Sequence, residues 1–288
     1  MRSFEKFVSD RANSVDASGI RKVFDLAAKM KDPINFSIGL PDFDVPAVAR
    51  SAAIDAIQSG HNRYTQTQGI APLRERIRAD LSKEFGRDVG EVLITSGVSG
   101  GLFLAILATI NPGDEAIFLD PYFVMYKHLL TLAGGRSVMV DSYPTFLFDP
   151  AKVERAITPK TKLLILNSPS NPTGIVMSEA EIKSAVELAR KHDLLIISDE
   201  IYEPFLYDMV DGGQSVLPSP AQSFDRTIVL RGFSKSHAMT GWRLGYAAGP
   251  AEIIAQMTKL QQYTYVCAPS AFQYAALKAM DIPMDDAI

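Results

Sequence analysis

Short apolar segments recur along the chain and alternate with segments of helical character. Six of these segments are predicted to be β-strands: Glu91–Thr95, Ala116–Leu119, Ser137–Val140, Lys162–Leu166, Leu194–Ile197 and Thr227–Leu230. Their apolar residues are nearly continuous instead of alternating, which is typical of parallel strands covered on both faces. The pattern therefore predicts an α/β protein with a mainly parallel sheet between helices.

Helical periodicity is predicted for Gly100–Ile110, Val124–Leu132, Ser178–His192 and Ala251–Gln262. The best marked of these helices begins at Ser178 with the capping-box sequence Ser-Glu-Ala-Glu. There the Ser178 side chain can accept the backbone N–H of Glu181, and the Glu181 side chain can reach back. Ile182, Val186 and Ala189 then fall on one face of the helix.

The pattern is weaker before Pro46. Val23–Met30 resembles a helix and Ile34–Gly39 an extended segment. We therefore expect residues 1–45 to form an N-terminal arm beside a main domain at residues 46–288, and no Ser/Gly-rich linker separates the two.

Composition excludes several classes of protein. The 288 residues are 47% apolar and 22% charged, which supports a large core and excludes a mainly disordered chain. The net charge of −4 argues against a broad cationic surface, so we expect no nucleic-acid partner. Cys267 is the only cysteine, so no intrachain disulfide can form. Leu102–Ile110 is far shorter than the roughly 20 residues of a membrane span, and residues 1–7 lack a secretory pattern. We expect a cytoplasmic protein with no membrane partner.

Polar residues follow four of the predicted strands, at the edge of a parallel sheet where ligands bind. A glycine-rich helix start, Gly97–Gly101, follows the first strand. The side chains are Asn171 after Leu166, Asp199 and Tyr202 after Ile197, and Lys235 and Arg243 after Leu230. A lysine can form a Schiff base with an aldehyde, and an aspartate can keep a pyridine nitrogen protonated. Tyr and Asn can donate to a ring oxygen, while an arginine and a helix N-terminus bind phosphate. Pyridoxal 5'-phosphate (PLP) carries all of these groups.

Each of these residues also has a structural interpretation when taken alone: Asp199 as a helix cap, Lys235 as a solvated lysine, Tyr202 as a core aromatic. The glycine run Gly97–Gly101 loosely resembles a dinucleotide-binding turn, but it lacks the G-x-G-x-x-G spacing. Four strand ends that carry one complementary set favour the PLP interpretation.

From about Ile38 to Ala279 the sequence resembles the class I aminotransferases, which are fold-type I PLP-dependent enzymes. The matching motifs are Asn171-Pro-Thr-Gly174, Asp199-Glu-Ile-Tyr202, and Ser234-Lys235 followed by Met239-Thr-Gly-Trp-Arg-Leu-Gly245. The resemblance implies that Lys235 is the Schiff-base lysine, that Asp199 holds the pyridinium and that Tyr202 holds the ring oxygen. It further implies that Asn171 contacts that oxygen and the substrate carboxylate, and that Arg243 binds the phosphate.

The resemblance extends to weaker motifs. Gly97-Val98-Ser99 falls where backbone amides hold the phosphate, and Phe123 in Pro121–Tyr126 falls where an aromatic residue stacks on the pyridine. Gly39 matches a backbone contact to the substrate. Tyr64 matches a tyrosine that reaches the phosphate of a neighbouring subunit, which implies a homodimer.

The chain departs from the family pattern in two places. Gly232 stands three residues before Lys235, where many relatives carry a hydroxyl residue, and Ser234 offers a hydroxyl instead. Relatives also continue into a C-terminal small domain whose arginine pairs with the substrate carboxylate. No residue of this chain matches that arginine, so we expect the small domain to be absent after residue 288, with residues 1–45 contributing part of it.

The resemblance implies an aminotransferase that moves an amino group between an L-amino acid and a 2-oxo acid. Two alternatives remain open from the sequence. One is a PLP-binding or dimerising fragment with impaired catalysis, and the other is a lyase or decarboxylase of the same fold.

Overall fold

The structure is a computed structural model, and it describes residues 4–16, 19, 23, 26–27, 29–32, 34, 39–206 and 216–282. All structural statements below refer to these residues. The expected helix Val23–Met30 and the extended segment Ile34–Gly39 fall partly outside the described residues. The division of the chain at residue 45 stays a prediction.

A seven-stranded sheet forms the centre of the protein, in the order β1-β7-β6-β5-β4-β2-β3. The strands are β1 (Glu91–Thr95), β2 (Glu115–Asp120), β3 (Arg136–Asp141), β4 (Thr161–Asn167), β5 (Leu195–Asp199), β6 (Thr227–Gly232) and β7 (Gly245–Gly249). All six predicted strands are present within two residues of their predicted ends. The α/β fold with a mainly parallel sheet is therefore confirmed.

Strand β7 was not predicted from the sequence, and it is antiparallel to both of its neighbours, β1 and β6. Its sequence Gly-Tyr-Ala-Ala-Gly lacks the branched residues typical of strands. Glycine is nevertheless needed there, because a Cβ at Gly249 would lie 2.8 Å from the carbonyl oxygen of Thr227 on β6. Close packing between neighbouring strands therefore sets the composition of β7.

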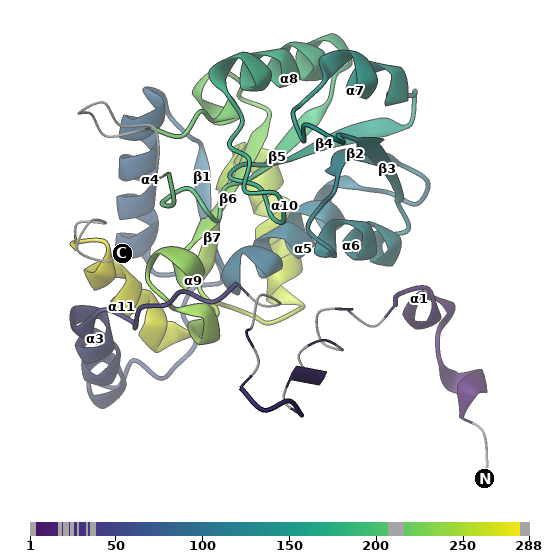
Figure 1. Cartoon of the computed structure of the whole chain (residues 1–288). Helices are drawn as coiled ribbons and strands as arrows, with labels where there is room; N and C mark the ends of the chain where they lie inside the picture. The colour runs from purple at the N-terminus through teal and green to yellow at the C-terminus, as the bar shows by residue number, and fades with distance from the viewer. Residues whose placement is uncertain are drawn as a thin grey trace.

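Helices cover both faces of the sheet (Figure 1). They are α1 (Asp10–Asn13), α3 (Ala47–Gln58), α4 (Ala71–Phe85), α5 (Gly97–Thr109), α6 (Met125–Ala133), α7 (Pro150–Ala156), α8 (Glu179–Lys191), α9 (Phe233–Ser236), α10 (Ala251–Gln262) and α11 (Ser270–Ala279). Short 3-10 helices lie at Glu5–Phe7, Pro220–Gln222 and Thr240–Trp242. Among the described helices, none is long and apolar enough to cross a lipid bilayer.

Alternate residues of the buried strands point to opposite layers. Ile165 and Ile197 pack in a core with α5, α6 and α10. Leu164 and Ile196 pack on the opposite face against α7 and α8. The continuous apolar runs of β4 and β5 are explained by this burial on both faces.

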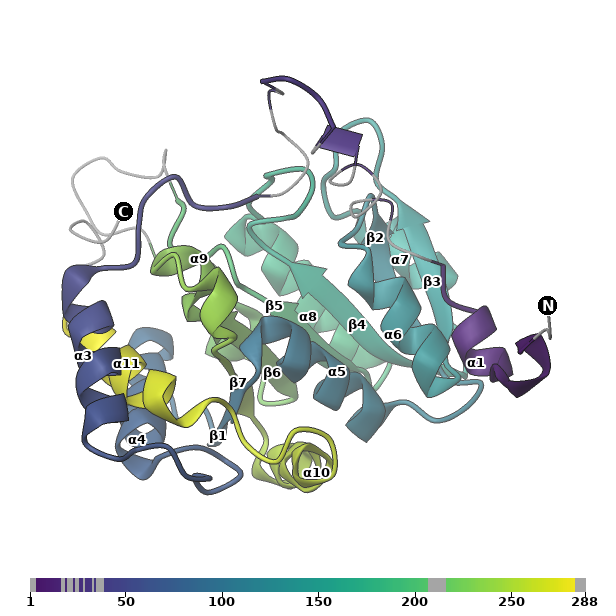
Figure 2. The same ribbon diagram turned by 90° about the horizontal axis from the view of Figure 1, so that it is seen from below.

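Helices α3, α4 and α11 form a third cluster beside β1 and β7, in which Ala49, Leu73 and Ala276 are fully buried. The sequence analysis did not single out these three helices. Figure 2 shows α3 and α11 side by side, and the N-terminal helix α1 close to α6.

The predicted capping box of α8 is present in full. Ser178 Oγ accepts the Glu181 backbone N–H at 3.3 Å, and Glu181 Oε2 accepts the Ser178 backbone N–H at 2.9 Å. Glu181 Oε1 also accepts the backbone N–H of Phe148 at 2.8 Å, which connects the start of α8 to the loop before α7.

We predict that Ser178→Ala lowers the free energy of unfolding by about 1 kcal/mol, because the Glu181 backbone N–H in the first turn of α8 loses its acceptor. Urea unfolding of the purified protein measures the change. Lys183→Ala, at an exposed mid-helix position, is the matched control and should change stability by less than about 0.5 kcal/mol. Equal effects of both variants would contradict the assigned role of the cap.

Candidate active site

The carboxyl ends of β4, β5 and β6 bring most of the candidate residues together. Asn171 lies in the loop after β4, Asp199 is the last residue of β5, and Lys235 lies in α9 directly after β6. Neighbouring parallel strands end at the same edge, and the pairing of Asn167 with Asp199 aligns the ends of β4 and β5.

Asp199 is a buried carboxylate, with only 2% of the residue exposed. Its Oδ2 accepts a hydrogen bond from the Tyr126 hydroxyl at 2.8 Å, and its Oδ1 accepts the Ile201 backbone N–H at 3.4 Å. No lysine, arginine or histidine of the described residues forms a salt bridge with it. Burial raises the pKa of Asp199 to about 6, and the two hydrogen bonds offset part of the rise. The site therefore offers a carboxylate that lacks a cationic partner.

Lys235 is half-buried and reaches across the site. Its Nζ donates to the backbone carbonyl of Gly39 and lies 5.7 Å from the ring centre of Tyr202. Burial lowers the pKa of Lys235, and the positive charge of Arg243 lowers it further. Both effects favour the neutral amine, which is the nucleophilic form.

Asn171 and Tyr202 approach each other beside this lysine. Asn171 Nδ2 donates to the Tyr202 hydroxyl oxygen at 3.4 Å. Burial raises the pKa of Tyr202, and the charge of Asp199 adds to the rise, so the phenol stays protonated. Both side chains are therefore hydrogen-bond donors on the same side of the site.

Asn167 holds the two loops in register, a role that the sequence analysis missed. Its Oδ1 accepts the backbone N–H of Asn171 at 2.7 Å, and its Nδ2 donates to the backbone carbonyl of Asp199 at 2.9 Å. The position of Asn167 at the end of β4 was the available signal, but which side chain bridges two loops depends on tertiary contacts.

The N-terminus of α5 and Arg243 form a second part of the site. Gly97 has φ +68°, and a Cβ there would lie 2.7 Å from Arg243 Nη2, so the guanidinium rests against the first turn of α5. A Cβ at Gly245 would lie 2.8 Å from the backbone nitrogen of Val98. The unpaired amides of this first turn and the guanidinium together can bind an anion.

The surroundings of Gly232 explain why glycine replaces the hydroxyl residue that many relatives carry at this position. A Cβ at Gly232 would lie 2.9 Å from Gly245 Cα and 3.1 Å from the Leu244 carbonyl oxygen. A hydroxyl residue therefore does not fit at this position with β6 and β7 so close. Ser234, two residues later, is buried at the start of α9.

The remaining candidate residues differ in how close they lie to this site. Phe123 connects to Asp199 through Tyr126, since the Phe123 and Tyr126 rings meet edge to face at 5.7 Å. Ser99 lies in the first turn of α5. Tyr64 is 83% exposed, and no interaction joins it to another candidate residue in the described part of the chain.

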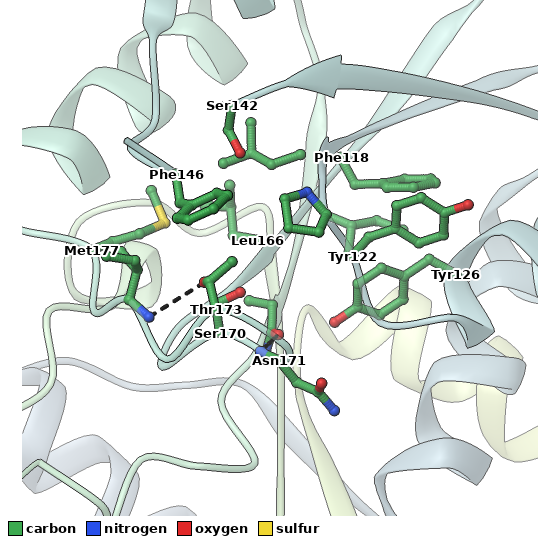
Figure 3. Close-up of a pocket in the computed structure, with 15 residues that line it drawn as sticks. Phe118, Tyr122, Tyr126, Ser142, Phe146, Leu166, Ser170, Asn171, Thr173 and Met177 are labelled. Atoms are coloured by element: carbon green, nitrogen blue, oxygen red, sulfur yellow. Dashed lines mark hydrogen bonds between the residues drawn. The ribbon is translucent and has the colours of Figure 1, made fainter. Parts of the chain in front are cut away.

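A pocket lies between the ends of β2 and β4 and the Asn171 loop (Figure 3). Its wall is largely aromatic, with Phe118, Tyr122 and Phe146, and the Ile175 backbone N–H donates to Thr173 Oγ1 at 3.3 Å across the loop. Asn171 and Tyr126 also belong to this wall, so the pocket adjoins the candidate site.

Comparisons with known proteins agree with this geometry. The family model for aminotransferases of class I and II matches residues 31–286. The chain is 41% identical to a putative aminotransferase, YugH, of Bacillus subtilis, over 97% of this chain and 73% of that relative. It is 40% identical to an aspartate aminotransferase of Pyrococcus abyssi, over 95% of this chain and 71% of that relative.

Solved structures give the same result. A single mutant of the Thermus thermophilus aspartate aminotransferase superposes with a TM-score of 0.88 at 36% identity, covering 97% of this chain and 73% of that one. The fold is therefore that of the fold-type I PLP-dependent enzymes. Within that class, the chain belongs to the family of class I and II aminotransferases, which transfer amino groups between amino acids and 2-oxo acids.

Enzymes of this family use PLP, and the residues of the site fit that cofactor. Asp199 is a buried carboxylate with no cation beside it among the described residues, and a pyridinium N–H would supply one. Arg243 and the first turn of α5 offer a cationic cradle for a phosphate. Lys235 offers an amine whose pKa is lowered, as bonding to an aldehyde requires.

The raised pKa of Asp199 predicts a pH dependence of stability without cofactor. A folded-state pKa of about 6, above the ordinary value of 3.8, means that folding favours the protonated carboxyl. Stability from this group is complete below pH 4 and is lost as the pH rises through 6, by about 3 kcal/mol in all. Asp199→Asn should lack this loss. Urea unfolding between pH 4 and 7 measures it, and parallel curves for both proteins would contradict the burial argument.

Proposed function

We propose that this chain is an aminotransferase in which Lys235 bonds the aldehyde of PLP and Asp199 holds the cofactor ring from the opposite end. The observation that carries the proposal is the Asp199 carboxylate, which is buried at the end of β5 and has no cation beside it among the residues that the structure describes. A buried, unpaired carboxylate is costly unless a cationic ligand completes it.

When bound, PLP supplies an aldehyde that amines attack and an electron-withdrawing ring that accepts negative charge from the substrate Cα. Asp199 keeps the proton on the ring nitrogen, so that the ring stays electron-poor. Tyr202 and Asn171 donate hydrogen bonds to the ring oxygen, a role that their 3.4 Å contact supports. Phe123 packs against the face of the ring.

The phosphate of PLP is held by Arg243, by the backbone of Val98 and Ser99, and by Ser234. The close approach of Arg243 to Gly97 at the start of α5 supports this assignment. A cofactor analogue without the phosphate charge should therefore bind more weakly, because it loses these contacts and keeps those to the ring.

Lys235 would also accept the proton from the substrate Cα. Burial and the charge of Arg243 lower the pKa of its half-buried amine, which favours the neutral form that accepts a proton. Gly39, whose carbonyl accepts from Lys235 Nζ, contacts the substrate through its backbone, and Asn171 contacts the substrate carboxylate.

We further propose that the chain acts as a homodimer in the cytoplasm. Tyr64 is 83% exposed and would reach the phosphate in the neighbouring subunit. Phe4 and Phe7 are each more than 70% exposed, and a second copy would cover such apolar side chains. A single cysteine fits a reducing compartment.

We predict that Lys235→Ala lowers transaminase turnover by about 10³-fold or more, because both the attachment point and the proton carrier are lost. Borohydride reduction with PLP should label the peptide containing residue 235 in the wild type and leave the variant unlabelled. Lys259→Ala, at an exposed position of α10, is the control and should retain both properties. A label on another lysine, or none on folded protein, would overturn the proposal.

A half-reaction separates an aminotransferase from the other enzymes of this fold. With PLP and an amino acid alone, we expect one equivalent of 2-oxo acid per site, after which the reaction stops until a second 2-oxo acid is added. Absorbance of the cofactor and chromatography of the products measure this. Continuous turnover without a 2-oxo acid would indicate a lyase or decarboxylase, and no conversion would indicate cofactor binding only.

A further inference from the structure

Tyr126 is a buried tyrosine in the first turn of α6, with 2% of the residue exposed. Its ring meets the rings of Phe118 and Phe123 edge to face, each at 5.7 Å between centres. Two aromatic contacts and complete burial leave the ring one orientation, so the position of its hydroxyl is fixed by the core.

That hydroxyl makes the shortest hydrogen bond to the Asp199 carboxylate, 2.8 Å to Oδ2. The other donor within the described residues is the Ile201 backbone N–H, at 3.4 Å from Oδ1. Tyr126 therefore has more control than any other described side chain over the orientation and charge of Asp199.

We propose that Tyr126 is a positioning residue for the cofactor, which aims the Asp199 carboxylate at the ring nitrogen with its hydroxyl and supports Phe123 with its ring. The assignment rests on the proposed function of Asp199 and Phe123. One side chain thereby couples the residue at the end of the pyridine ring to the residue that packs against its face.

The charged and titratable groups around Asp199 support this assignment. Tyr126 approaches from α6, Tyr202 from the turn after β5, and Glu200 from the neighbouring position on the chain. Glu200 raises the pKa of Asp199, although Arg231 binds Glu200 at 2.8 Å. Burial and the charge of Asp199 raise the pKa of Tyr126 well above its ordinary value, so Tyr126 remains a donor.

The chain offers a matched control for this hydroxyl. Tyr122 lies four residues earlier, and its ring packs on the same Phe118, at 4.8 Å between centres. No hydrogen bond joins the Tyr122 hydroxyl to Asp199 among the described residues. Tyr122→Phe therefore removes the same atom from the same aromatic cluster without touching the carboxylate.

The test follows the Asp199 carboxyl by carbon NMR in the protein without cofactor, with Asp199→Asn assigning the signal. We expect Tyr126→Phe to raise the midpoint of the Asp199 titration by about one pH unit, because a hydrogen bond to the charged form is lost. The PLP dissociation constant, from cofactor absorbance, should rise on the order of tenfold. Tyr122→Phe should leave both values at those of the wild type.

A second variant covers the case in which Tyr126→Phe does not fold. Fluorotyrosine placed at position 126 alone has a more acidic phenol, donates a stronger hydrogen bond and should shift the Asp199 midpoint downward. Unchanged midpoints in the Phe and fluorotyrosine proteins, or equal shifts for residues 122 and 126, would overturn the inference. Failure of the wild type to bind PLP would instead overturn the proposed function, since the titration needs no cofactor.

Discussion

The physical constraint on which the rest of the site depends is that Asp199 is buried with no cation beside it in the described part of the chain. The carboxylate at the end of β5 accepts two hydrogen bonds, and burial raises its pKa to about 6 despite them. Burying this carboxylate away from solvent is a cost to folding that the surrounding packing must offset. A cationic ring nitrogen is the partner that would complete it, and the cofactor of the family provides one.

A buried ionic network supports the strand ends that carry this group. Arg231, on β6, is 6% exposed and donates to Glu200 beside Asp199 and to both oxygens of Glu84 on α4. Ser198 and Ser219 donate to the remaining oxygen of Glu200. Every oxygen of Glu200 is therefore satisfied, so the segment after β5 is fixed relative to β6 and Lys235. Removing one partner of such a network typically costs about 3–5 kcal/mol.

Much of the fold and the site could be predicted from local pattern and from motif order. The buried strands are continuous in apolar residues, and Asn171, Asp199 and Lys235 each follow one of them. Strand β7 could not be predicted, because its two glycines reflect the close approach of β6 and α5. The need for glycine at position 232 could not be predicted either, because it also comes from close packing between strands. Tyr126 lay within a recognised motif, yet no sequence pattern records which hydroxyl meets which carboxylate.

The sequence by itself determined the α/β class, the polar residues that follow each parallel strand, and the fit of those residue types to PLP. These properties are local, since strand periodicity and side-chain chemistry do not depend on distant contacts. Only the tertiary structure decided that Lys235 reaches Gly39, that Arg243 rests on Gly97 and that Tyr126 binds Asp199. Such contacts join residues from 70 to almost 200 positions apart. They depend on how helices pack on the sheet, and the charge states of Asp199 and Lys235 depend on the burial that this packing produces.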